Sequence, residues 1–130
     1  MNSNVRVQQL LFEGLNDPYI TDFIGGTLYN GKRPARSEVG EDITLAPLPI
    51  NDEFVQTATV NVNVFVKDQV EGVPDYGRAD EIFQRIVERL DNYSINPYFE
   101  TRIASSQLSD SEVKGYTLLN IRVICKILKE

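Results

Sequence analysis

The chain has 130 residues, of which 42% are hydrophobic and 25% are charged, as expected for one ordinary globular domain and not for a disordered chain. It contains no histidine, which excludes Ser-His-Asp, Cys-His and zinc–histidine chemistry together. The net charge of −6 argues against a protein that grips DNA, because such proteins neutralise phosphates with a basic face. The charge is still compatible with a protein surface along which DNA passes without binding.

The single cysteine, Cys125, cannot form an internal disulfide, which fits a reducing compartment. No apolar run reaches the length of a membrane span, and no basic-then-apolar leader follows Met1. We therefore expect a soluble protein that is neither exported nor membrane-bound.

The first predicted element is an amphipathic helix from Ser3 to Leu15, which ends before Pro18 because a proline disfavours the helical conformation of the preceding residue. We expect this helix to close over a sheet, and a partner-facing helix is the alternative. A short strand is predicted near Gly26–Tyr29. The apolar stripe of the helix consists of Val7, Leu10, Leu11 and Leu15.

Residues 30–42 are polar, charged and interrupted by glycine and proline, which predicts a long loop or extended arm. Loops of this length without structure of their own are usually functional or disordered. Two interpretations stay open: the charges pair with a neighbouring subunit, or the arm is solvated. The basic end carries Lys32, Arg33 and Arg36, and the acidic end carries Glu38, Glu41 and Asp42.

A strand is predicted to begin at Ile43–Leu45, and Pro47 and Pro49 restrict it to an edge or a bend. The run Phe54–Asp68 then alternates with a period of two, which predicts an antiparallel strand with one packed face. Because strands usually have five or six residues, we expect this one to extend beyond its sheet or to bend at a bulge. Its packed face carries Val60, Val62, Val64 and Val66.

The other face of this strand is polar but uncharged until Lys67. A surface in contact with solvent normally carries more charge, so we interpret this face as a candidate for subunit contact. It consists of Thr57, Thr59, Asn61, Asn63 and Phe65.

The clearest helix is predicted from Arg78 to Leu90, followed by a strand at Tyr98–Ser106, a polar loop at Gln107–Gly115 and a last strand at Tyr116–Leu128. Cys125 falls on the more apolar face of the last strand and is interpreted as an inert core residue, with a reactive thiol as the alternative. The apolar stripe of the helix consists of Ala79, Ile82, Phe83, Ile86 and Leu90.

The order of elements predicts an α+β fold in a single domain spanning residues 1–130. We expect an antiparallel sheet of about four to five strands, with the N-terminal helix and the central helix packed on one face.

No pattern in the chain predicts catalysis, a cofactor or a metal site. The acidic residues Asp68, Glu71, Asp75, Asp80 and Glu81 do not have the spacing of a calcium loop. Glu100 and Arg102 are two apart on one strand, so we expect them to share a face and to pair there. The glycines match no phosphate-binding motif.

Three segments resemble small proteins from structural-gene clusters of Bacteroidetes phages and prophages. With the order of elements, the whole chain resembles a tail terminator, or tail-completion protein, of a long-tailed phage. The matching segments are Gly26–Ser37, Glu41–Leu45 and Thr59–Val66.

The resemblance implies a non-enzymatic structural protein of the virion neck, made in the cytoplasm of a bacterial host. Such proteins form a homohexameric ring that caps the tail tube and contacts the head connector, while DNA passes through the bore without specific binding. Loops of these proteins reach to neighbouring subunits, and the matching candidates are the Asn30–Asp42 arm and the Gln107–Gly115 loop. A head-closure or adaptor protein of the same neck, and a non-catalytic binding module, are the alternatives.

A closed ring uses heterologous contacts, in which one patch meets a different patch of the next subunit. We therefore expect the basic end of the arm to meet an acidic patch. The candidate pairs set Lys32, Arg33 and Arg36 against Asp110 and Glu112, or against Asp68 and Glu71.

Overall fold

A computed structural model describes residues 4–34, 40–48, 55–91, 93–95 and 99–128. These residues form three helices and one five-stranded antiparallel sheet with the strand order β1-β2-β5-β4-β3. The helices are α1 (Asn4–Leu15), α2 (Pro18–Thr21) and α3 (Tyr76–Leu90), and the strands are β1 (Ile43–Pro47), β2 (Val55–Lys67), β3 (Ser94–Ile95), β4 (Phe99–Asp110) and β5 (Tyr116–Leu128).

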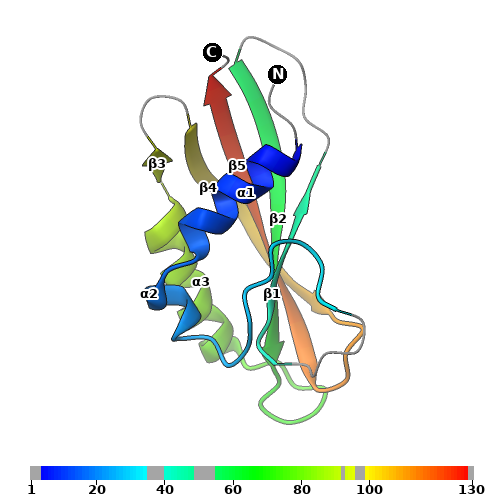
Figure 1. The fold of residues 1–130 in the computed structure, drawn as a ribbon. Coiled ribbons are helices and arrows are strands. Elements are labelled where there is room, and N and C mark those ends of the chain that lie inside the picture. Colours follow the sequence, from blue (N-terminus) through cyan, green and yellow to red (C-terminus); the bar gives the residue numbers. More distant parts are fainter. Residues whose placement is uncertain (1–3, 35–39, 49–54, 92, 96–98, 129–130) are drawn as a thin grey trace.

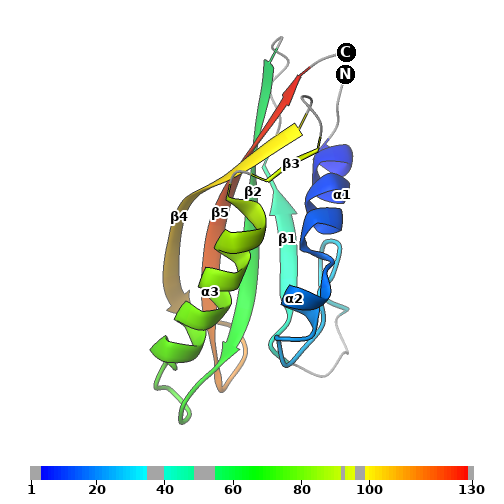
Figure 2. The same ribbon diagram turned by 90° about the vertical axis from the view of Figure 1, so that its left-hand side faces the viewer.

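The three helices cover one face of the twisted sheet: in Figure 1 α1 crosses in front of β5 and β2, and in Figure 2 α3 lies in front of the strands with α1 and α2 to its right. α1 packs on β1 and β2, whereas α3 packs on β4 and β5 and against both other helices. The α+β fold with helices on one face is therefore confirmed, and the opposite face of the sheet carries no described helix.

The long strand β2 has the predicted alternation, with all four valines buried and Lys67 exposed. The prediction of a bulge in this strand is wrong, because β2 pairs with β5 from Val55↔Leu128 to Lys67↔Tyr116 without interruption. β5 also has 13 residues, so it pairs with one edge of β2 along its whole length and β2 does not extend beyond the sheet, whereas β1 pairs with the other edge only at Val60–Val64.

A bulge lies on β4 instead, where Ala104 is the extra residue between the pairs Ile103↔Val123 and Ser105↔Arg122.

The loop predicted at Gln107–Gly115 is longer than the loop in the structure. Its first four residues continue β4 and pair with β5 as far as Asp110↔Thr117. The hairpin turn therefore comprises only residues 111–115 and ends at Gly115, whose φ of 85° favours glycine.

The last strand has the predicted faces, and Cys125 is fully buried among core residues. Burial raises the pKa of this thiol to about 12. A protonated, inaccessible thiol is unreactive, so the structure supports the interpretation of Cys125 as a core residue.

The strand predicted near Gly26–Tyr29 is wrong, because only Leu28 forms a single parallel bridge, to Ile43. The segment nevertheless runs along the outer edge of β1. Ile43 donates its backbone N–H to Thr27 O at 3.0 Å, and Tyr29 donates to Ile43 O at 2.8 Å. β1 is thus the edge strand that its prolines predict, and this segment covers part of its open side.

This covering segment packs so closely on residues 40–42 that only glycine fits at two positions. A Cβ atom at Gly26 would lie 2.5 Å from the backbone carbonyl carbon of Glu41, and one at Gly40 would lie 2.6 Å from Gly25 O. Both contacts are with backbone, which cannot rotate away as a flexible side chain can.

We expect Gly26→Ala to lower the free energy of unfolding by about 2 kcal/mol, the cost of overpacking a close contact. Gly77→Ala is the matched control, because its nearest atom would be Asp75 Oδ1 at 3.7 Å and the residue lies within α3. An alanine there should raise stability by about 0.5 kcal/mol. Urea denaturation measures both changes, and equal stability of the two variants would contradict the close packing.

Candidate functional site

The arm that connects the covering segment to β1 ends in two buried carboxylates. Glu41 is 8% exposed and Asp42 is 2% exposed. Arg78 of α3 donates from Nε to Glu41 Oε2 at 2.9 Å and from Nη2 to Oε1 at 2.7 Å, and Gly25 N donates to Oε1 at 2.7 Å. The prediction that Glu41 and Asp42 lie at an exposed acidic end, free to pair with another subunit, is therefore wrong.

Asp42 holds the other side of the same arm. Its Oδ1 accepts a hydrogen bond from Thr27 N at 2.9 Å, and its Oδ2 lies 3.5 Å from Arg33 Nε. The Arg33 guanidinium also lies over the Phe65 ring, 5.7 Å from its centroid. Two of the predicted interface residues, Arg33 and Phe65, thus contact each other within one chain.

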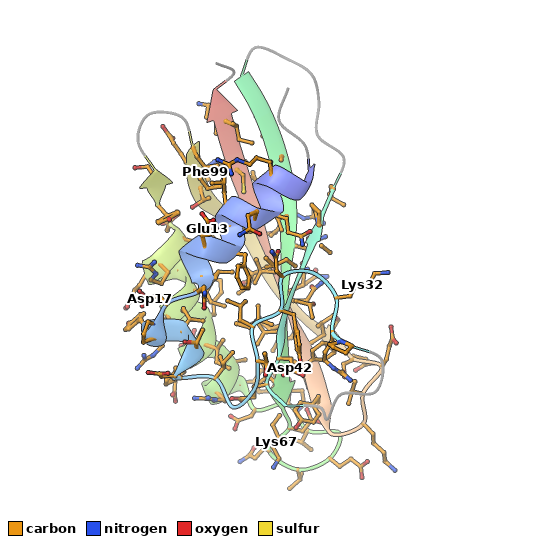
Figure 3. The ribbon with its side chains drawn as sticks, in the orientation of Figure 1. Glu13, Asp17, Lys32, Asp42, Lys67 and Phe99 are labelled. Carbon is orange, nitrogen blue, oxygen red and sulfur yellow. The ribbon has the colours of Figure 1, made fainter. Side chains whose placement is uncertain are left out.

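The basic residues of the arm differ in their surroundings. Lys32 is exposed and points outward in Figure 3, whereas Asp42 lies inward. Arg33 is engaged as described above, and Arg36 and Glu38 lie outside the described residues. The arm is also tied to α1, because Gln8 Nε2 donates to Asn30 Oδ1 at 2.9 Å.

Burial by itself would raise the pKa of Glu41, but the hydrogen bonds from Arg78 and Gly25 outweigh it and hold this pKa below its usual value of 4.5. A carboxylate with a lowered pKa stabilises the fold above its unfolded-state pKa. This stabilisation is lost as the pH falls through the folded-state pKa.

Arg78 is the first of three α3 arginines that turn toward the segment preceding the arm. Arg85 donates to Tyr19 O at 2.9 Å and stacks on Phe23 at 3.8 Å, and Arg89 donates to Gly14 O at 2.8 Å. The spacing of seven and four residues places the three on one flank of the helix. They therefore hold α2 and its neighbours against α3.

The exposed charged residues of α3 and its C-cap Asp91 are acidic, and the uncharged Gln84 lies among them. They lie on the side of the helix away from its buried stripe, since their spacing of one, four, eight and eleven residues confines them to one sector. With the arginines turned inward, this sector presents an acidic row to solvent. The row consists of Asp80, Glu81, Gln84, Glu88 and Asp91.

The helix-free face of the sheet has an uncharged centre. Asn120 Nδ2 of β5 donates to Asn63 Oδ1 of β2 at 2.8 Å. The neighbouring Asn61 Oδ1 is buried and has no hydrogen-bond donor among the described residues. The predicted interface residues Asn61 and Asn63 therefore share the middle of this face.

Cations surround that centre. Arg122 lies opposite Asn61 on β5, Arg102 lies on the adjacent β4, and Lys67 ends β2 at the lower end of the sheet in Figure 3. Arg102 and Lys126 border a shallow pocket together with Glu100. The exposed charged residues of this basic sheet face are Lys67, Glu100, Arg102, Arg122 and Lys126.

Glu100 and Arg102 share this face as predicted, but Glu100 lies opposite Lys126 and Arg102 opposite Ile124. The ion pairs found among the described residues do not include a Glu100–Arg102 pair.

The acidic residues predicted to pair with the arm lie near the turn that joins β4 to β5. Asp110 and Glu112 are exposed there, so they are accessible to a partner. Asp68 instead accepts a hydrogen bond from Thr117 Oγ1 at 2.6 Å. Glu71 pairs with Lys114 at 3.3 Å, where both side chains are largely exposed.

Within the described ranges, no group of three or more metal-binding side chains gathers. None of the helices described is long and apolar enough to cross a membrane. No family model matches the chain, and no curated protein matches it.

The arginine flank and the basic sheet face were not predicted. The spacing of Arg78, Arg85 and Arg89 away from the apolar stripe was a usable signal for the flank. The basic sheet face had no such signal, because Arg102 and Arg122 become neighbours only through the pairing of β4 with β5.

We expect Glu41→Gln to lower the free energy of unfolding by about 2 kcal/mol near neutral pH. This is less than the roughly 3–5 kcal/mol of a fully buried pair, because the Arg78 side chain keeps 26% of its surface exposed. The difference from wild type should shrink as the pH falls below about 4.5, since Glu41 is then protonated first in the unfolded chain and, at lower pH, also in the folded protein. Urea denaturation from about pH 7 to about pH 3 measures this, and a pH-independent difference would contradict it.

Asn61 and Asn63 provide a matched pair of variants. Asn61→Val should raise the free energy of unfolding by about 1 kcal/mol, because it removes a buried acceptor without a donor. Asn63→Val should lower it by a similar amount, about 1 kcal/mol, because Asn120 Nδ2 loses its acceptor. Thermal and urea denaturation measure both, and a loss of stability in Asn61→Val would show that Asn61 is satisfied within the chain.

Proposed function

We propose that this protein is a ring-forming structural subunit of the neck of a long-tailed phage, and specifically its tail terminator. The observation that carries the proposal is the helix-free face of the sheet, whose centre is uncharged at Asn61 and Asn63. Two long strands with alternating side chains make this surface continuous and rigid. Such a surface suits contact with another protein better than contact with water alone.

In this role, copies of the chain form a homohexameric ring that caps the finished tail tube. The ring contacts the tail tube protein on one side and the head connector or head-closure protein on the other. DNA passes through the bore, and the negative net charge of the chain suits a bore that does not retain it. The function requires assembly, and no step of it requires catalysis.

Purified protein, alone and with tail tubes, tests the proposal. Native mass spectrometry should detect hexamers, and electron microscopy should find the protein as rings at the ends of tail tubes. A protein that stays monomeric at high concentration and does not bind tail tubes would contradict the ring.

Purified head connectors serve as the second ligand in the same experiment. Binding at tube ends supports the terminator role. Binding to connectors without any binding to tubes would instead assign the chain to the head-closure or adaptor position and overturn the terminator role.

A further inference from the structure

We infer that neighbouring copies in the ring meet through unlike faces: the basic sheet face of one copy binds the acidic row of α3 on the next. This inference rests on the proposed ring and names its contact. In this contact the basic sheet face, and not the arm, supplies most of the positive charge, because Arg33 of the arm is engaged with Asp42 and Phe65 of its own chain.

The basic sheet face gathers positive charge on an acidic protein. Four of its five exposed charged residues are cationic, with Glu100 the exception. The ion pairs found among the described residues include none of Arg102, Arg122 or Lys126. These cations are therefore available to carboxylates from outside the chain.

The acidic row is the complementary surface. Its carboxylates are left exposed because the α3 arginines turn toward α2 and the arm. Asp80 is exposed, and the hydrogen bond that it accepts within the described part of the chain is long, at 3.3 Å from Gln84 Nε2. Glu81 lies 3.9 Å from Arg78 with 63% of its side chain exposed. Such loose, exposed contacts are readily exchanged for partner contacts.

The two surfaces lie on opposite sides of the molecule. The buried stripe of α3 faces the sheet, so the acidic row faces away from it, whereas the basic sheet face lies on the helix-free side. A copy that docks its sheet face on the helix of the next leaves its own helix open for a third copy. This heterologous arrangement closes into a ring when each step includes a suitable rotation.

The size of the sheet face is sufficient for such a contact. β2 and β5 each have 13 residues, which at a rise of about 3.3 Å gives a length of about 40 Å. Three strands about 4.8 Å apart add a width of about 14 Å. The footprint of roughly 600 Å² lies at the lower end of the about 600–1,000 Å² that each partner buries in a standard interface.

Charge reversal on either surface tests the contact. Arg102→Glu with Arg122→Glu makes the sheet face acidic, and Asp80→Lys with Glu81→Lys and Gln84→Lys makes the α3 row basic. The second set leaves Glu88 in place, because it contacts Tyr19, and includes Glu81, because its contact with Arg78 is long and exposed. Each variant alone should associate at least about tenfold more weakly than wild type, since like charges then meet at every contact.

An equal mixture of the two variants should restore the wild-type oligomer with alternating subunits, because every contact again joins unlike charges. Native mass spectrometry resolves this composition. Circular dichroism checks that each variant is folded. Two controls should assemble as wild type: Arg102→Lys with Arg122→Lys, which keeps the charge, and Glu112→Lys with Lys114→Glu, which exchanges charges on the hairpin.

The outcomes separate this inference from the proposed function. If wild type and both charge-reversal variants form the same oligomer, or if the mixture fails to restore it, the proposed contact is wrong, whereas the proposed ring is not contradicted. If the variants assemble normally but lose binding to tail tubes, the sheet face serves the tube and the contact between copies is wrong. A wild type that neither self-associates nor binds tubes overturns both.

Discussion

The ion pair between Glu41 and Arg78 joins the start of β1 to α3 and to the segment that follows α2. Glu41 precedes β1, Arg78 lies in the first turn of α3, and the same guanidinium donates to Phe23 O at 2.7 Å. A buried carboxylate is tolerated only when its charge is paired and hydrogen-bonded. Together with the contacts of Asp42, this interaction between residues 37 positions apart holds the end of the arm against Gly25 and Gly26.

This constraint also distributes charge over the surface. Arg78, Arg85 and Arg89 are turned inward against the segment from Gly14 to Phe23, so α3 shows carboxylates to solvent. The helix-free side of the sheet carries the cations Arg102 and Arg122 around an uncharged centre. The acidic row of α3 and the basic sheet face therefore carry opposite charges, and such a pair of surfaces suits head-to-tail assembly.

The sequence was sufficient for elements whose pattern is local. The alternation in β2 and β5, and the stripe of α3, predicted the fold class and the buried faces, including that of Cys125. It was insufficient where long-range pairing decides the structure. Gln107–Asp110 has the composition of a loop but continues β4 because β5 offers partners. Likewise, Glu41 and Asp42 have the sequence context of exposed arm residues, and only the fold brings Arg78 and Thr27 to them.

Zero-length cross-linking of the wild-type oligomer directly tests whether the basic sheet face of one copy contacts the acidic row of the next. Isotopically mixed subunits distinguish links between copies from links within one copy, and mass spectrometry locates them. If the sheet face of one copy binds the acidic row of the next, amide links are expected between Lys126 or Lys67 of one copy and Asp80 or Glu81 of the next. Links between copies that join only Lys32 to Asp110 or Glu112 would contradict it, because they would place the contact at the arm and the hairpin instead.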